Sequence, residues 1–249
     1  MPLTHPALDL TDDAAVRAAF ERDQPQLIIH CAALSKSTDC EQNPARARTL
    51  NVDATARLAE LAADRALIFF STDLVFDGQA GNYDEAAAVN PLSVYAETKV
   101  AAERIVLANP RHSVVRTSLN YGTSPVRDRA FNEEMVRAWA AGRTTRLFTD
   151  EFRCPIPAEV TAQAVWELAA AEKPGLYHLA GAERLSRWDI GQLVAAHCAN
   201  FPALMEACSL REYRGAPRPP DTSLNCGKIQ KLLTAPLPRF SAWLAKCST

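Results

Sequence analysis

The fold is decided by one stretch in the first third of the chain, Ala66-Leu-Ile-Phe-Phe-Ser-Thr-Asp-Leu-Val-Phe-Asp-Gly78. It begins as a short, continuously apolar run, which is typical of a strand buried on both faces. The run ends in Ser71 and Thr72 and is followed by a turn. Ligands bind at this end of the strands in open parallel sheets. Thr72 is therefore a candidate to bind a substrate carbonyl, although Ser71 and Thr72 could instead only cap the turn.

Similar apolar runs alternate with helical patterns over about the first 120 residues. Strands are expected at 26–33, 66–70 and 113–118, and helices at 12–23, 44–64 and 91–109. Apolar strands connected by helices predict an α/β fold with a parallel sheet that is covered on both faces.

A second part of the chain has a looser pattern and is expected to form a smaller C-terminal lobe. Helices are expected there at 128–141, 159–171 and 186–197, a strand at 175–179, and a last helical segment from about residue 227. We therefore predict two domains, 1–122 and 123–249, and allow that some later segments return to the sheet of the first.

Composition narrows the class of protein. The chain has 249 residues, a net charge of −2 and 48% hydrophobic residues, which describe a globular protein without the basic face that nucleic acids or membrane surfaces require. No apolar run approaches the length of a membrane span and no signal peptide is evident, so we expect a cytoplasmic protein. Seven cysteines without a CxxC pair favour reduced thiols over a disulfide or a metal site.

Two further segments carry candidate chemistry. In Tyr95-Ala-Glu-Thr-Lys99, a phenol and an ammonium group are one helical turn apart, so the cation can favour the phenolate and bring its pKa toward neutrality. The same spacing also occurs on exposed helix faces. In His30-Cys-Ala-Ala-Leu-Ser35, small residues after a strand allow a cofactor to approach closely, or simply pack under a helix. His30 itself is expected to be a hydrogen-bonded core residue.

Together these segments make the chain resemble the extended short-chain dehydrogenase/reductase family, in its dTDP-4-dehydrorhamnose reductase-like branch. The resemblance covers essentially the whole chain. Beyond the three segments above, it rests on Asp9-Leu-Thr-Asp12, Asp39-Cys-Glu41, Leu50-Asn-Val52, Val115-Arg-Thr-Ser118, Gly175-Leu-Tyr-His-Leu-Ala-Gly181 and Arg218-Pro-Pro-Asp-Thr-Ser-Leu224. It implies a Rossmann-like doubly wound sheet, an oxidoreductase activity and NADP (as NADPH) or NAD as cofactor.

The resemblance also implies roles for individual residues in reducing a 4-keto sugar nucleotide. Thr72 would orient the carbonyl, Tyr95 would donate its proton, and Lys99 would lower the pKa of Tyr95 and hold the nicotinamide ribose, with Asn51 in support. The cofactor would be contacted by Asp9, Leu10, Cys31, Ala32, Ala33, Asn51, Ser71, Tyr95, Lys99, Arg116 and Thr117.

On the substrate side, the resemblance implies contacts from Asp73, Val75, Asn120, Arg153 and Arg218. A guanidinium fork matches the oxygens of a diphosphate, although either arginine could instead belong to a surface ion pair. Asn120 departs from the branch, which commonly has an aromatic residue there, and this puts dehydrorhamnose itself in doubt. A homodimer is compatible with the family.

A second departure concerns the glycine-rich GxxGxxG loop of the family, which is not found in the sequence. The segment from Met1 to Asp12 resembles the part of the family that follows the second strand, so we expect about 30 residues to be absent. Either the natural reading frame starts further upstream, which we favour, or the chain is truly truncated. A true truncation predicts weak cofactor binding and poor stability.

Alternative functions stay open at this point. An epimerase or dehydratase of the same superfamily would keep tightly bound oxidised NAD, but dehydratases usually place Asp-Glu where this chain has Asp73-Leu74. A non-catalytic binding or regulatory protein is the other alternative, since the regulatory beta subunit of methionine adenosyltransferase is similar to the same branch.

Overall fold

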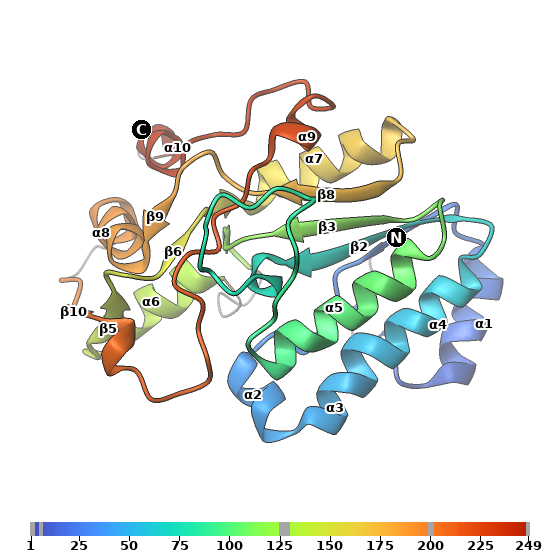
Figure 1. The fold of residues 1–249 in the computed structure, drawn as a ribbon, viewed down its shortest axis with the longest axis horizontal. Coiled ribbons are helices and arrows are strands. Elements are labelled where there is room, and N and C mark those ends of the chain that lie inside the picture. The colour runs from blue at the N-terminus through green and yellow to red at the C-terminus, as the bar shows by residue number, and fades with distance from the viewer. Residues whose placement is uncertain (1–2, 5–6, 125–129, 199–201, 248–249) are drawn as a thin grey trace. The chain divides into compact units, whose positions relative to one another are not determined.

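The computed structural model describes residues 3–4, 7–124, 130–198 and 202–247 of the chain, which forms two compact units (Figure 1). The first unit comprises Met1–Val75, Val89–Arg116 and Pro174–Tyr177, and the second comprises Phe76–Ala88, Thr117–Lys173 and His178–Thr249. The chain thus crosses between the units several times. One crossing, between Arg116 and Thr117, lies near the domain boundary that the sequence predicts after residue 122.

The first unit is built on a parallel sheet, as predicted. Its order is β1-β2-β3-β8, formed by β1 (Leu27–His30), β2 (Ala66–Thr72), β3 (Ser113–Thr117) and β8 (Gly175–Leu179). β1 and β2 are parallel, with Leu27 opposite Ala66 and His30 opposite Phe69. Because neighbouring parallel strands end at the same edge, the residues that follow β1 and β2 share one edge of the sheet.

The helices of the first unit are α1 (Asp13–Asp23), α2 (Ser37–Gln42), α3 (Pro44–Arg48), α4 (Ala54–Leu61) and α5 (Val94–Leu107). α4 and α5 pack on the strands, while α1 contacts α4, and α2 and α3 contact α5. α4 and α5 lie side by side along the sheet (Figure 1), and their core with the strands contains Ala59, Ala62, Leu67, Phe69, Ala102, Val106 and Val114. Side-chain caps fix where helices begin: Asp12 accepts the N–H of Ala15 at 3.0 Å, and Ser93 accepts that of Ala96 at 3.3 Å.

The predicted helix over 44–64 is observed with one local irregularity. α3 continues into a π-helical turn, η1 (Thr49–Asp53), and then into α4. Such turns inside α-helices often lie at functional sites. Here the turn carries the buried side chain of Asn51.

The second unit contains short strand pairs packed with helices. Its elements are β4 (Asn120–Tyr121), α6 (Phe131–Ala140), β5 (Thr145–Phe148), β6 (Phe152–Arg153), β7 (Ile156–Pro157), α7 (Ala158–Ala170), β9 (Leu185–Ser186), α8 (Arg187–Cys198), β10 (Met205–Cys208), η3 (Leu210–Glu212), α9 (Gly227–Gln230) and α10 (Phe240–Cys247). β5 pairs with β10 and β4 with β7 in parallel, whereas β6 and β9 are antiparallel. Met135, Trp139, Leu147, Ile190, Val194, Phe240 and Leu244 form its core.

The segment Phe76–Ala88 belongs to the second unit although it directly follows η2 (Asp73–Val75). The N–H of Tyr83 donates to the carbonyl of Ser223 at 2.9 Å, and the Tyr83 ring stacks on Phe76 with centroids 4.1 Å apart. Gly81 has φ +67°, and a Cβ there would lie 2.5 Å from Oδ2 of Asp221. The turn therefore requires glycine.

Most predicted elements are observed, and the errors are at their ends. The strand expected at 175–179 coincides with β8, and the strand expected at 66–70 extends through Thr72. The helix expected at 128–141 is observed from Phe131, and residues 128–129 lie outside the described part of the chain. Within the described ranges, none of the helices has the length and apolar character that crossing a membrane requires.

Candidate functional site

Ser71 and Thr72 are the last residues of β2, and both side chains are buried. Oγ1 of Thr72 accepts the N–H of Leu74 at 3.2 Å, so this hydroxyl does cap η2, as one interpretation of the sequence proposed. Oγ1 of Thr72 also donates to Oδ1 of Asp73, at a longer distance of 3.3 Å. Since a hydroxyl can accept and donate at once, the cap orients Oγ1 and leaves its proton able to turn to a ligand.

α5 places Tyr95 and Lys99 on one buried face, one turn apart. Their exposed fractions are 9% and 3%, so the interpretation of this spacing as an exposed helix face is wrong. The Tyr95 ring belongs to an apolar cluster with Cys40 and Ala47, against which Leu74 packs. Because Leu74 also donates to Thr72, the tyrosine lies near the turn that Thr72 caps.

The ammonium group of Lys99 lies in a largely apolar environment. Nζ is 3.9 Å from the centroid of the Phe69 ring on β2. Burial lowers the pKa of Lys99 to about 7, and the negative charge of Glu103 acts in the opposite direction, as does Cys31 when its thiol is ionised. Among the described residues, none accepts a hydrogen bond from Nζ. Its N–H donors are therefore available to a ligand.

Glu103 and Arg116 form a buried ion pair in the first unit, and the charge of Glu103 acts on Lys99. The guanidinium of Arg116 donates from Nε and Nη2 to the two oxygens of Glu103, at 3.0 and 2.7 Å, and Ser71 donates its hydroxyl to the same carboxylate. All three side chains are buried. Ser71 and Arg116 thus contact a carboxylate of the protein, and their contacts with a cofactor stay predictions.

Small residues follow β1 at the same edge of the sheet. Cys31 and Ala32 are exposed and Ala33 is half-buried. His30, the last residue of β1, is buried, with Nε2 3.0 Å from Oγ1 of Thr55, which confirms that it is a hydrogen-bonded core residue. Burial, together with the charge of Lys99, lowers the pKa of His30 to about 3, so its ring is neutral.

Asn51 connects the loop after β1 to α5. Its Oδ1 accepts the N–H of Leu34 at 2.8 Å, and its Nδ2 donates to the Leu34 carbonyl at 3.1 Å and to Oγ1 of Thr98 at 3.0 Å. Thr98 in turn donates to the carbonyl of Tyr95 at 2.7 Å. Asn51 therefore connects the loop after β1 to the helix that carries Tyr95 through hydrogen bonds.

The other predicted residues of the first unit differ in exposure. Asp9 is exposed, and its Oδ1 accepts from the N–H and the hydroxyl of Thr11 at 2.8 Å. The carbonyl of Leu10 accepts from Nη1 of Arg57 at 2.9 Å. Asp73 and Val75, which the resemblance places near substrate, are fully buried.

In the second unit, Thr117 and Asn120 contact each other. Nδ2 of Asn120 donates to Oγ1 of Thr117 at 3.2 Å, and its Oδ1 accepts from Thr161 at 2.7 Å. The amide of Asn120 is therefore oriented by protein contacts.

Arg153 and Arg218 lie beside one buried carboxylate of the second unit. Arg218 donates from Nε and Nη2 to the two oxygens of Glu151, at 2.7 and 2.8 Å, and Nη1 of Arg153 is 3.8 Å from Oε1. Burial opposes ionisation of Glu151, but hydrogen bonds from Arg218 and the charges of the surrounding arginines hold its pKa below the usual value. Arg153 is only 6% exposed, so for this residue the surface ion pair is wrong.

Arg187, at the start of α8, brings a third guanidinium to this cluster. Its backbone N–H donates to the carbonyl of Glu151 at 2.9 Å, while its buried Nη1 has no hydrogen-bond partner among the described residues. Burial lowers the pKa of Arg187 to about 10, with Arg153 and Arg218 adding to the effect and Glu151 opposing it. Glu151 and, at Arg187, also Glu134 supply negative charge to this group of three guanidiniums. Three positive charges against these two carboxylates suit an anionic ligand.

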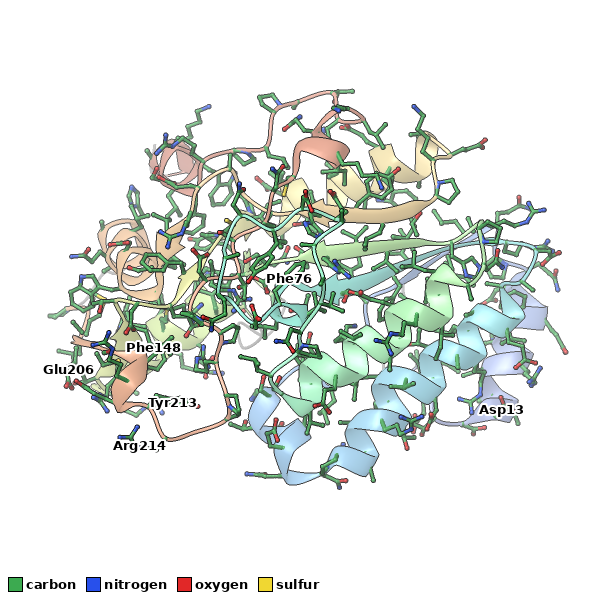
Figure 2. All side chains as sticks on the ribbon, in the orientation of Figure 1. Asp13, Phe76, Phe148, Glu206, Tyr213 and Arg214 are labelled. Carbon is green, nitrogen blue, oxygen red and sulfur yellow. The ribbon has the colours of Figure 1, made fainter. Side chains whose placement is uncertain are left out.

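Two aromatic rings adjoin Arg218. Phe148 at the end of β5 and Tyr213 after η3 meet edge to face, with centroids 5.5 Å apart (Figure 2). Both line a cavity of about 260 Å³, together with Arg146, Cys208, Ser209 and Glu212. The guanidinium carbon of Arg218 is 5.4 Å from the Phe148 centroid and 5.8 Å from that of Tyr213. Aromatic rings beside a cation suit a flat ligand that carries negative charge.

Several of these residues were missed by the sequence analysis. Glu103 follows Lys99 by four positions, so the spacing that identified Tyr95 and Lys99 also points to it. Glu151, Arg187, Phe148 and Tyr213 have no such local signal, because they come together only through folding of the second unit. In the described part of the chain, no three His, Cys, Asp or Glu side chains are grouped so that they could hold a metal ion.

Comparison with known proteins gives one family and several relatives. The family model described as RmlD substrate binding domain matches residues 1–249. The chain is 32% identical over 235 residues to methionine adenosyltransferase 2 subunit beta of Xenopus laevis, covering 90% of this chain and 70% of the relative. It is 30% identical over 247 residues to a probable low-salt glycan biosynthesis reductase of Haloferax volcanii, covering 96% and 82%.

A solved structure agrees with these relatives. A dTDP-4-dehydrorhamnose reductase of Clostridium acetobutylicum superposes with a TM-score of 0.88 at 26% identity, and the match covers 100% of this chain and 88% of that one. The likeness confirms the predicted Rossmann-like α/β class.

Proposed function

This chain belongs to the RmlD substrate binding domain family, and from that premise we propose that it is an NAD(P)H-dependent reductase of a 4-keto sugar nucleotide. The observation that carries the proposal is the buried ammonium of Lys99, which has no hydrogen-bond acceptor among the described residues and lies one helical turn from Tyr95. The printed names of the Haloferax and Clostridium relatives, both reductases, support the same reaction class.

The residues of the first unit fit the nicotinamide end of a dinucleotide. The free N–H donors of Lys99 match ribose hydroxyls, and the exposed Cys31 and Ala32 allow close approach at the edge of the sheet. None of the nine glycines forms a GxxGxxG pattern, so the proposal assigns no residue to the dinucleotide diphosphate. When bound, the reduced nicotinamide supplies the hydride.

The chain itself supplies the proton and the polarisation of the ketone. Tyr95 donates its phenolic proton to the ketone oxygen, and the nearby ammonium of Lys99 stabilises the phenolate that this leaves. Thr72 donates a hydrogen bond to the same oxygen from a hydroxyl that the Leu74 N–H orients. Burial of Tyr95 and Lys99 strengthens their electrostatic interaction, because little water screens it.

The second unit, considered by itself, carries a candidate site for a nucleotide. We infer that Arg153, Arg187 and Arg218 bind the diphosphate, since three guanidinium groups face the two carboxylates of Glu151 and Glu134. The rings of Phe148 and Tyr213 would hold the base.

Turnover tests the proposal directly. Purified protein is mixed with NADPH and a dTDP-4-keto-6-deoxy sugar, and loss of reduced nicotinamide is followed by absorbance, with the free keto sugar as control. The proposal predicts oxidation that depends on the nucleotide-linked ketone. Absence of oxidation with either NADPH or NADH, across dTDP- and UDP-linked 4-keto sugars, would refute it.

The Xenopus relative favours a second candidate, a regulatory binding protein. That role predicts a stable complex with a methionine adenosyltransferase catalytic subunit, detectable by size-exclusion chromatography with light scattering, and no turnover of keto sugar nucleotides. The two experiments together separate the candidates.

A further inference from the structure

Glu103 is a buried carboxylate that the reduction, as outlined above, does not use. It lies one helical turn beyond Lys99 on α5 and is 3% exposed. Residues four apart on a helix are neighbours on one face, so the carboxylate is held close to the ammonium. Glu103 is fixed from two strands, by the hydroxyl of Ser71 on β2 and by the fork of Arg116 on β3. These hydrogen bonds fix the position of the Glu103 carboxylate.

The charged and titratable groups around Lys99 come from several elements. Glu103 lies on its own helix, while His30 and Cys31 lie at the end of β1, and Arg116 on β3 reaches the region through Glu103. The aromatic ring of Phe69 on β2 contributes no net charge. His30 is neutral because of its burial, and burial raises the pKa of the Cys31 thiol, so that thiol is protonated at neutral pH. Glu103 is therefore the main negative charge that acts on Lys99.

We propose that Glu103 is a positioning residue of the reductase, which keeps the Lys99 ammonium charged and in place while Ser71 and Arg116 hold the carboxylate fixed. This rests on the proposed function, because Lys99 matters through its effect on Tyr95. Without this counter-charge, the buried ammonium of Lys99 would lose its proton at a lower pH than it does with Glu103 present, and a neutral amine cannot stabilise the Tyr95 phenolate. Glu103 acts through Lys99 and touches neither cofactor nor substrate.

The competing interpretation is that Glu103 and Arg116 form only a structural ion pair. Buried pairs of this kind are common, and removing one partner destabilises a protein whatever else the pair does. Loss of stability alone therefore cannot distinguish the two. The distinguishing quantity is the pKa of Lys99 in a folded variant.

The experiment titrates Lys99 by NMR in protein that carries isotopically labelled lysine, without cofactor or substrate. The Lys99 signal is assigned as the one that Lys99→Met removes. Glu103→Gln is compared with Glu97→Gln, an exposed glutamate of the same helix. The pKa of Lys99 is expected to fall by about one unit or more in Glu103→Gln, and to stay unchanged in Glu97→Gln. An unchanged pKa in folded Glu103→Gln would overturn the proposal.

A second variant covers the case in which Glu103→Gln does not fold. Combining Glu103→Gln with Arg116→Gln removes both charges and leaves two amides that can bond to each other. Glu103 acts on the pKa of Lys99 and Arg116 does not appear among its causes, so the pKa is still expected to fall. A pKa equal to that of the unchanged protein would again overturn the proposal.

Activity gives an independent readout. If turnover requires the charged ammonium, kcat falls as pH rises through the pKa of Lys99, and Glu103→Gln moves this fall to lower pH by the shift that NMR measures. A matching shift supports the proposal, and a fall at the original pH contradicts it. If the unchanged protein shows no turnover at all, the proposed function fails while the NMR titration still decides whether Glu103 controls Lys99.

Discussion

Replacing Lys99 by methionine should change how the stability of the protein depends on pH. The ordinary pKa of lysine is 10.5, and burial lowers that of Lys99 to about 7. Between these values the unfolded chain binds the proton and the folded protein does not. The free energy of unfolding therefore rises with pH across this window, and the cost of burying Lys99 is largest at and below about pH 7.

The size of the effect follows from the difference in pKa. Each unit is worth about 1.4 kcal/mol, so Lys99 lowers the free energy of unfolding by about 4 kcal/mol at pH 7 and by about 2 kcal/mol at pH 9. Methionine has a similar apolar stem and no titrating group. It loses the contact of the ammonium with Phe69, which is worth on the order of 1 kcal/mol and fades as Lys99 loses its proton above about pH 7.

Urea unfolding followed by circular dichroism measures the difference. Lys99→Met is expected to be the more stable protein at pH 7, with an advantage that shrinks by about 2 kcal/mol between pH 7 and pH 9. Lys36→Met, at an exposed lysine of the first unit, is the control and should follow the unchanged protein throughout. Parallel curves for Lys99→Met and the unchanged protein would refute the claim that the ammonium is buried at a cost.

Three other substitutions test neighbouring features. Asn51→Ala leaves both backbone groups of Leu34 without their partner and should lower the free energy of unfolding by about 1–3 kcal/mol, measured by urea titration; a loss below about 0.5 kcal/mol would contradict the role of the bridge. Arg218→Lys breaks the bidentate pair with Glu151 that fixes the arginine cluster and should weaken binding of dTDP about tenfold or more by calorimetry, whereas equal affinity would exclude Arg218 from the anion site. Gly81→Ala forces a Cβ against Asp221 at positive φ and should cost at least about 1–2 kcal/mol in thermal unfolding, and an unchanged melting temperature would show that the turn adapts.

The sequence predicts the sheet well because the strands of the first unit contain short apolar stretches that are recognisable on their own. This holds for β2 and β3, and α5 between them contributes Ala102 and Val106 to the core. The short strands of the second unit have two to four residues, too few for any periodicity, so pairs such as β6 with β9 were not expected. The π-helical turn at Asn51 was also missed, and the side chain that it carries contacts Leu34, which is distant in sequence.

The candidate site was predictable where chemistry follows local spacing. Tyr95 and Lys99 are one turn apart on a single helix, and Thr72 ends a strand that is recognisable alone. Burial was not predictable from the sequence, and it determines the electrostatics, because the lowered pKa of Lys99 comes from its burial. The role of Arg187 in the arginine cluster was also not predictable, because its neighbour Glu151 is distant in the sequence.

The central claim is that Tyr95 transfers a proton to a ketone in the first unit. The most direct measurement compares NADPH oxidation by the unchanged protein and by Tyr95→Phe, with a dTDP-4-keto-6-deoxy sugar as substrate and dTDP binding as a check that the fold is intact. We predict a loss of kcat of about 100-fold or more with dTDP affinity preserved. Turnover at the original rate in Tyr95→Phe would contradict the account.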